Sequence, residues 1–349
     1  MGDFTAYELV DFGGGRKLER FGPYLLDRPA PAAQDRPHLA PDGWAAADAR
    51  FERSDAQRGT WQRQEAMPLE WTIDWHDGCR LELRLTPSGQ VGLFPEQAAA
   101  MRAALVALAA PAPVSATVPA PAPAPVSATV PAPTPVSATV PAPAPTPVAP
   151  ATVLHLFAYT GAATLAAARR GAAVTHVDAA RSAVNWARRN AERSRLAEAP
   201  IRWIVDDAAT FVRREYRRGR RYDALLIDPP SYGHGPSGQS WQIERDLVPL
   251  LHEAAGLLSP ARRLVLLSCH TPGWEPSELA RCLAEACEVP LAEVATSRLM
   301  LETSAGRQLP QGALACWTAG RDDAPHDAVA ARRDAHGDRS PSASRPTAR

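Results

Sequence analysis

Short apolar runs recur through the second half of the chain, and segments of helical length and spacing separate them. The runs occupy residues 153–157, 173–177, 201–205, 223–228 and 263–269. Strands that alternate with helices in this way predict a parallel sheet with helices packed against it. Two further runs, near 289–300 and 313–318, predict a C-terminal hairpin. The expected fold is therefore α/β, a Rossmann-like doubly wound sheet over about 152–320.

The first 109 residues show a different pattern, which predicts a small β-rich domain that ends in a helix. Residues 6–10 and 16–21 flank three consecutive glycines, and a hairpin is expected there. Alternating apolar and polar positions in 61–75 and 80–85 predict half-buried strands. An alanine-rich segment that reaches about Ala109 predicts the helix.

The tryptophans of this first part fit two interpretations. Their rings suit stacking against nucleic-acid bases, but tryptophans in a small β unit more often form its core. We favour the core interpretation for all four. They are Trp44, Trp61, Trp71 and Trp75.

Residues 110–151 are low in complexity, with Pro-Val-Ser-Ala-Thr-Val starting at Pro113, Pro125 and Pro135. Proline removes backbone donors and favours extended polyproline II, so we expect a disordered linker. A ligand for aromatic-lined grooves is the second interpretation. The charged, proline-bearing residues 321–349 are expected to form a disordered tail.

The composition narrows the functional classes. The 38 lysines and arginines balance 38 aspartates and glutamates, so no net positive field marks a nucleic-acid binder. Lys17 is the single lysine of the chain. The five cysteines form no CxxC or CxxH pair, so we expect no metal site, and their odd number favours a reducing compartment. Without a signal sequence or a bilayer-spanning stretch, a cytoplasmic protein with no membrane partner is expected.

The first apolar run of the α/β part enters a turn with one glycine, Phe157-Ala158-Tyr159-Thr160-Gly161. In a doubly wound sheet, ligands bind beyond the carboxyl ends of the strands. Gly161 would let the backbone approach a ligand and begin a helix. One glycine is a weaker signal than GxGxxG. Asp178 at the end of the next run strengthens it, because a carboxylate there can accept hydrogen bonds from both ribose hydroxyls.

The same carboxylate repels a phosphate, which disfavours NADP, and no Walker sequence is present for ATP. The third run ends in Asp206-Asp207-Ala208. Asp207 is the better placed of the two aspartates to accept a hydrogen bond from an adenine amine. Both aspartates can also cap the helix that follows, and the two interpretations can hold for one residue each.

Asp228-Pro229-Pro230-Ser231-Tyr232 follows the fourth run. The prolines stiffen the turn and would present the carboxylate beside a donor methyl group, and Tyr232 suits stacking on a planar base. An Asp-Pro-Pro sequence can be an ordinary turn. Downstream of a nucleoside-binding unit, however, it predicts methyl transfer from S-adenosylmethionine.

Cys269 ends the fifth run and is a candidate nucleophile. Carbon 5 of a pyrimidine becomes nucleophilic only after a thiolate adds to carbon 6, and Asp228 would then steady the ring. The alternative is a buried cysteine that acts as a small hydrophobe. A reactive thiol needs an exposed, electropositive setting, so both interpretations stay open.

These motifs, together with Gly92-Leu-Phe-Pro-Glu-Gln97, resemble the bacterial ribosomal RNA methyltransferases of the large-subunit cytosine-C5 type. The resemblance covers about 80–320 without the Pro-Ala segment. It implies S-adenosylmethionine as cofactor, held by the glycine turn and the three acidic positions, with Phe94 and Gln97 closing over it. It also implies ribosomal RNA as substrate and attack by Cys269. His270 departs from the serine common in that family, and no PUA domain is recognised.

Three hypotheses follow. The first and favoured one is a cytosine-C5 RNA methyltransferase that uses Cys269. The second is an N-methyltransferase in which Asp228-Pro-Pro binds an exocyclic amine. The third is a dinucleotide-binding oxidoreductase or a silent nucleoside-binding module. Clustered arginines suit RNA phosphates or solvated helix faces almost equally, and the pattern does not indicate the oligomeric state. These arginines are Arg188, Arg189, Arg193, Arg195, Arg213, Arg214, Arg217, Arg218, Arg220 and Arg221.

Overall fold

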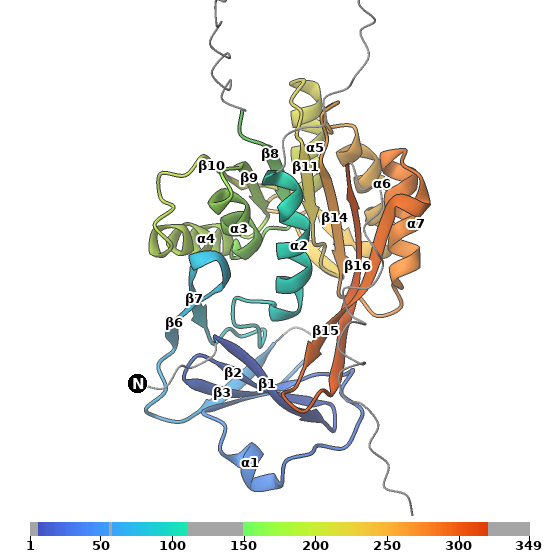
Figure 1. The fold of residues 1–349 in the computed structure, drawn as a ribbon. Helices are drawn as coiled ribbons and strands as arrows, with labels where there is room; N and C mark the ends of the chain where they lie inside the picture. Colours follow the sequence, from blue (N-terminus) through green and yellow to red (C-terminus); the bar gives the residue numbers. More distant parts are fainter. Residues whose placement is uncertain (1–5, 56–57, 110–148, 320–349) are drawn as a thin grey trace, which may run out of the picture. The chain divides into compact units, whose positions relative to one another are not determined.

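Seven strands of the C-terminal part form one mixed sheet (Figure 1). The computed structural model describes residues 6–55, 58–109 and 149–319, so most of the expected linker and all of the expected tail lie outside the described residues. The strand order is β10-β9-β8-β11-β14-β16-β15, in which β16 alone runs antiparallel to the other six strands. The strands are β8 (Thr152–Leu156), β9 (Ala173–Asp178), β10 (Ile201–Val205), β11 (Ala224–Ile227), β14 (Leu264–Cys269), β15 (Val294–Glu302) and β16 (Gln308–Thr318). The expected doubly wound α/β fold is confirmed.

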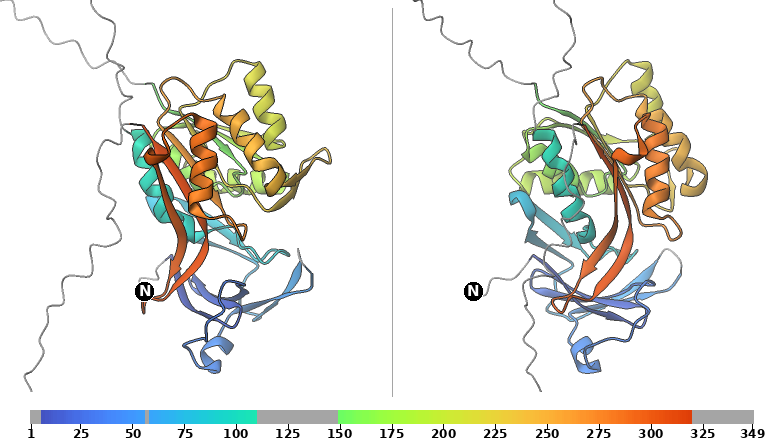
Figure 2. Two further views of the ribbon diagram at one scale, coloured as in Figure 1. Left: turned by 90° about the vertical axis from the view of Figure 1, so that its right-hand side faces the viewer. Right: turned by 45° about the vertical axis from the view of Figure 1, so that its right-hand side comes forward.

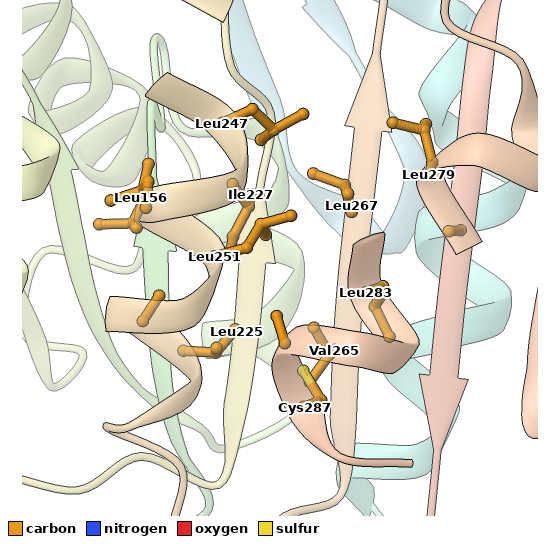
Figure 3. Close-up of a cluster of buried hydrophobic side chains, with 14 of the residues drawn as sticks. Leu156, Leu225, Ile227, Leu247, Leu251, Val265, Leu267, Leu279, Leu283 and Cys287 are labelled. Atoms are coloured by element: carbon orange, nitrogen blue, oxygen red, sulfur yellow. The ribbon is translucent and has the colours of Figure 1, made fainter. Parts of the chain in front are cut away.

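Helices cover both faces of this sheet because its strands are apolar on both sides. One face packs against α5 (Ala208–Arg217), α6 (Ile243–Ala255) and α7 (Pro276–Cys287). Figure 3 shows part of this cluster, with Leu225, Ile227 and Val265 of the sheet facing Leu251 and Leu283 of the helices.

The other face of the sheet packs against α3 (Ala162–Arg169) and α2 (Ala98–Ala109), while α4 (Arg181–Arg193) packs near β9 and β10. Helix α2 is the alanine-rich helix expected at the end of the first domain. Its Leu105 and Leu108 nevertheless bury themselves with Val153 and Leu226 of the sheet.

A separate five-stranded sheet forms the N-terminal part, in the order β1-β2-β3-β4-β5. Its strands are β1 (Tyr7–Gly13), β2 (Arg16–Phe21), β3 (Tyr24–Pro29), β4 (Ala49–Arg53) and β5 (Gly59–Arg63). Helix α1 (Pro41–Ala45) and the hairpin of β6 (Glu70–Asp74) and β7 (Arg80–Arg84) complete it. Trp71 is buried in a core against which Trp61 and Trp75 pack, as the core interpretation expects.

Shorter elements connect these units. They are the 3₁₀ turns η1 (His76–Gly78), η2 (Pro95–Gln97) and η3 (Leu291–Glu293), and the hairpin of β12 (Tyr232–His234) and β13 (Ser240–Gln242). None of the helices in the described residues is long and apolar enough to cross a membrane.

Two sets of contacts between the N-terminal part and the α/β part involve buried side chains from both. The first is the β15–β16 hairpin, whose end lies against β1 (Figure 2). Leu301 and Leu309 pack with Leu9 there, and Arg307 forms an ion pair with the buried Asp11 at 2.7 Å.

The second contact joins β7 to α4 through polar groups. Asn190 accepts a hydrogen bond from the backbone N–H of Glu82 at 2.8 Å, and Trp186 Nε1 donates to the Glu82 carbonyl at 2.9 Å. The buried Glu82 carboxylate also forms ion pairs with Arg189 and Arg193. These directional bonds fix the N-terminal part next to the carboxyl ends of the strands.

Two buried histidines lie beneath the glycine turn and share one hydroxyl group. Thr164 Oγ1 lies 2.8 Å from His155 Nδ1 and 2.9 Å from His176 Nδ1. Burial lowers the pKa of His155 to about 4 and that of His176 well below the ordinary value. Both imidazoles are therefore neutral in the folded protein at physiological pH.

We expect this pair to make the fold sensitive to acid. Below about pH 6.5 the unfolded chain binds protons at these histidines and the folded chain does not, so stability falls as the pH falls toward 4. For His155 alone the loss between pH 7 and pH 5 is roughly 2 kcal/mol. Urea unfolding across this range should show a shallower pH slope in His155→Asn. His234→Asn, at an exposed site, is the control, and equal slopes in both variants would contradict the expectation.

Candidate functional site

The carboxyl ends of β8, β9, β10 and β11 open into a cavity of about 480 Å³. Parallel strands place their carboxyl ends on one edge, which is why sequence motifs far apart meet here. Of the residues expected in the site, eleven line this cavity. They are Phe94, Phe157, Tyr159, Asp178, Asp206, Asp207, Ala208, Asp228, Pro229, Pro230 and Ser231.

A smaller cavity of about 60 Å³ adjoins it, and the two share Phe94, Phe157, Tyr159 and Asp228. This smaller cavity is lined by Gln97 and by the remaining residues of the glycine turn. These turn residues are Ala158, Thr160 and Gly161.

The glycine turn is sharply bent. Gly161 has a φ of 85°, and a Cβ there would lie 3.0 Å from that of Ala187. Phe157 and Tyr159 also have positive φ angles, 55° and 47°, which non-glycine residues rarely adopt. Such strain persists only where surrounding contacts enforce it, and it often marks a binding site.

Asp178 supplies that enforcement. Its Oδ2 accepts a hydrogen bond from the Tyr159 backbone N–H, and its Oδ1 accepts one from Ala180, both at 2.8 Å. Each oxygen keeps a further lone pair for a ligand. Burial raises the pKa of this carboxyl group, although the two N–H donors oppose the shift.

Asp206 and Asp207, at the end of β10, have different partners. Asp207 caps α5, because its Oδ1 accepts from the Thr210 backbone N–H at 2.9 Å. Asp206 forms an ion pair with Arg214 at 2.6 Å. Both carboxylates also line the cavity, so capping and ligand contact are compatible in this geometry.

Asp228 lies at the tip of β11 and is held by two donors. Ser268 Oγ donates to Oδ1 at 2.5 Å, and Gln97 Nε2 donates to Oδ2 at 2.7 Å. Gln97 Nε2 is also 2.9 Å from His270 Nε2, whose ring bonds the Gln311 carbonyl through Nδ1 at 2.8 Å. The carboxylate therefore has a fixed orientation at the cavity wall.

The segment before α2 closes one side of the cavity. The Phe94 ring lies 5.6 Å from that of Tyr159 and 5.5 Å from that of His270, centroid to centroid. Thr160 Oγ1 donates to the Gly92 carbonyl at 2.6 Å. A side chain at position 92 would collide with Trp186, at 2.4 Å from the Cβ. Glycine is therefore required for this close approach.

Two expected residues have different surroundings. Tyr232 is 65% exposed on β12 and does not line the cavity. The Cys269 side chain is fully buried in the apolar cluster around α6 and α7, and burial raises the pKa of its thiol despite contacts with Thr271. Cys269 is absent from the residues that line either cavity.

Sequence reasoning missed several residues of the site. Trp241 stacks near Phe157, with ring centroids 4.9 Å apart, and its Nε1 donates to the Pro230 carbonyl at 2.6 Å. The turn therefore offers fewer free carbonyls than its sequence suggests. Ser268 and His270 flank Cys269 in the sequence, and this position at a strand end was the one available signal for their role.

The cavity suits a positively charged nucleoside. Four aspartates line it, whereas no lysine or arginine does so among the described residues. This charge attracts a sulfonium group and repels the pyrophosphate of a dinucleotide. The volume falls within the range of ordinary small-ligand sites.

Comparison with known proteins also indicates a methyltransferase. The family model described as conserved hypothetical protein 95 matches residues 138–240. The ribosomal RNA large subunit methyltransferase K/L of Syntrophotalea carbinolica is 36% identical over 114 residues, and that of Methylococcus capsulatus is 37% identical over 114. Each match covers 32% of this chain but only 16% and 15% of those relatives, respectively.

Solved structures match nearly the whole chain. The S-adenosylmethionine-dependent methyltransferase from Agrobacterium tumefaciens superposes with a TM-score of 0.74 at 31% identity, over 90% of each chain. A likeness of this extent sets aside the oxidoreductase and silent-module hypotheses. The chain belongs to the S-adenosylmethionine-dependent methyltransferases.

Proposed function

We propose that this enzyme methylates a base of ribosomal RNA, and that the acceptor atom is a nitrogen. The matched relatives are named for ribosomal RNA. The family model covers residues 138–240, the part of the chain that carries the glycine turn and Asp228. The observation that carries the nitrogen acceptor is the fixed carboxylate of Asp228 together with the burial of Cys269 away from both cavities.

The cofactor residues follow from the cavity. When bound, S-adenosylmethionine supplies an electrophilic methyl group on a positively charged sulfur. Asp178 would accept hydrogen bonds from the two ribose hydroxyls with its free lone pairs, and Asp206 and Asp207 would contact the adenine edge. Phe157 and the strained turn form the floor, and Phe94 with Gln97 closes the site and limits access of water.

On the acceptor side, Asp228 orients the nucleophile. An exocyclic amine donates a hydrogen bond to this carboxylate, which directs the nitrogen lone pair toward the methyl group. Ser268 and Gln97 keep the carboxylate from rotating away. In this reaction the N–C bond would form as the S–C bond to the methyl group breaks, S-adenosylhomocysteine would leave, and the amine proton would pass to the Asp228 carboxylate. A nitrogen acceptor therefore needs no covalent enzyme intermediate.

The cytosine-C5 alternative requires a thiolate that reaches carbon 6 of the base. The buried Cys269 side chain has a raised pKa and packs among apolar side chains, and both properties oppose nucleophilic attack. The sequence resemblance favours C5 chemistry, while the surroundings of the thiol favour nitrogen. Product analysis separates the two.

We expect Asp178→Asn to weaken binding of S-adenosylhomocysteine roughly 30-fold in calorimetry, because two hydrogen bonds of about 1 kcal/mol each are lost. Because burial raises the pKa of Asp178, wild-type affinity should fall on acidification at a higher pH than for an exposed carboxylate. The variant should lose this pH dependence. Asp74→Asn, at an exposed carboxylate, is the control, and unchanged affinity in Asp178→Asn would contradict the assignment.

Replacement of Cys269 by alanine tests the acceptor chemistry. For a nitrogen acceptor, we expect methyl transfer to an in vitro transcript of bacterial large-subunit ribosomal RNA to stay within about threefold of wild type, since only a small buried group is lost. Cys287→Ala, in the same apolar cluster, controls for packing. A loss of about a thousandfold or more in Cys269→Ala alone would instead establish the C5 mechanism.

A further inference from the structure

A third cavity, of about 650 Å³, lies between the N-terminal sheet and the β15–β16 hairpin. It shares five lining residues with the cofactor cavity: Ser88, Gln90, Phe94, Ser231 and His270. The two spaces are therefore contiguous around the Phe94 and His270 rings. The His270 imidazole lines both spaces and is 3.6 Å from Asp228, which lines the cofactor cavity, so the groove leads toward the acceptor carboxylate.

Lys17 lines the groove, and it is the single lysine among the 38 basic residues of the chain. Its side chain is largely buried, with Nζ 3.1 Å from Glu19 Oε1 and 3.1 Å from Gln311 Oε1. An ammonium group has three donors, so one remains for a ligand. Every other basic residue counted among the 38 is arginine, and the lysine ammonium is the more compact cation of the two.

The surrounding charges leave this wall positive. Arg28 also lines the groove and forms an ion pair with the same Glu19 carboxylate. Two cations thus share one buried anion. An excess positive charge in a partly buried wall attracts a phosphate group.

Glu96 supplies a different kind of contact. It is 8% exposed and lines the groove, and its Oε2 has no hydrogen-bond partner within the described structure. Its Oε1 lies 3.6 Å from His270 Nδ1, too far for a hydrogen bond. A buried carboxylate oxygen without a donor is costly, and an N–H group of a ligand would satisfy it.

We propose that this groove holds the acceptor nucleotide of a single-stranded RNA segment, an inference that rests on the proposed function. Lys17 contacts a backbone phosphate, and Glu96 accepts a hydrogen bond from an N–H on the edge of the base. The base then lies against Phe94 and His270 with its amine toward Asp228. Enzymes that modify a base take it out of the stack, and a deep groove beside the cofactor suits such a base.

The Lys17–phosphate contact and the Glu96–base contact predict different effects of substitution. Both are measured with the large-subunit ribosomal RNA transcript, whose affinity is determined by filter binding in the presence of S-adenosylhomocysteine. Lys17→Met should weaken binding roughly 5- to 10-fold and reduce the slope of log affinity against log salt by about 1. Glu96→Gln should leave that slope unchanged, because it removes a base contact. It should lower kcat/KM for methyl transfer roughly tenfold.

Arg80→Met removes one exposed positive charge outside the groove and should match wild type in affinity and in salt slope. Calorimetry with S-adenosylhomocysteine checks that each variant is folded. If Lys17→Met does not fold, Lys17→Arg and Glu96→Gln are tested instead. Wild-type rates of methyl transfer in both variants would then contradict the proposal that the groove binds the acceptor nucleotide.

If wild type binds the transcript and Lys17→Met binds it with the same affinity and salt slope, the groove assignment is wrong, and the proposed function is unaffected. A wild-type protein that binds S-adenosylhomocysteine but neither binds nor methylates the transcript would overturn the proposed function, and the groove assignment with it.

Discussion

The hydrogen bond from the Tyr159 backbone to Asp178 is the interaction on which the site depends. Two non-glycine residues in the turn have positive φ angles, and each such conformation costs on the order of 1 kcal/mol or more. The bond joins the turn after β8 to the end of β9, and it leaves the outer lone pairs of Asp178 facing the cavity. Loss of this carboxylate would therefore change the shape of the turn as well as remove the proposed ligand contact.

A second constraint closes the site from a distant part of the chain. The segment around Gly92 reaches the glycine turn through Thr160, and it can do so because β7 is bonded to α4 through Asn190. Asn190 also donates to the Thr160 carbonyl at 2.9 Å, so one buried amide links the hairpin, the helix and the turn. The N-terminal part thus helps to define the cavity.

Much of the α/β fold could be predicted from the sequence because its strands are continuous apolar runs that end in polar residues. The acidic residues at those ends met as expected, since parallel strands share an edge. The roles of Glu96, Ser268 and His270 could not be predicted, because each depends on a neighbour from another element. Cys269 is buried because β14 pairs with β16, where it lies opposite Ala313. Its position at the end of a strand does not reveal in the sequence that another strand covers it.

Helix α2 shows a related limit. Its alanine-rich sequence has no strongly one-sided apolar face, so its sequence did not reveal which sheet it would cover. Its place along the chain suggested the N-terminal domain, whereas Leu105 and Leu108 lie among the side chains of the seven-stranded sheet. The helix packs there because it covers apolar surface of that sheet. The local sequence of a helix does not show which distant surface it will cover.

The four aspartates around the proposed cofactor cavity also bear on turnover. The methyl donor carries a positive charge on sulfur, and the thioether left after transfer is neutral at that atom. An acidic cavity therefore retains the charged donor more strongly than its spent form. The carboxylates therefore hold the spent product less tightly than the donor, so the charge lost in methyl transfer helps fresh donor to displace product.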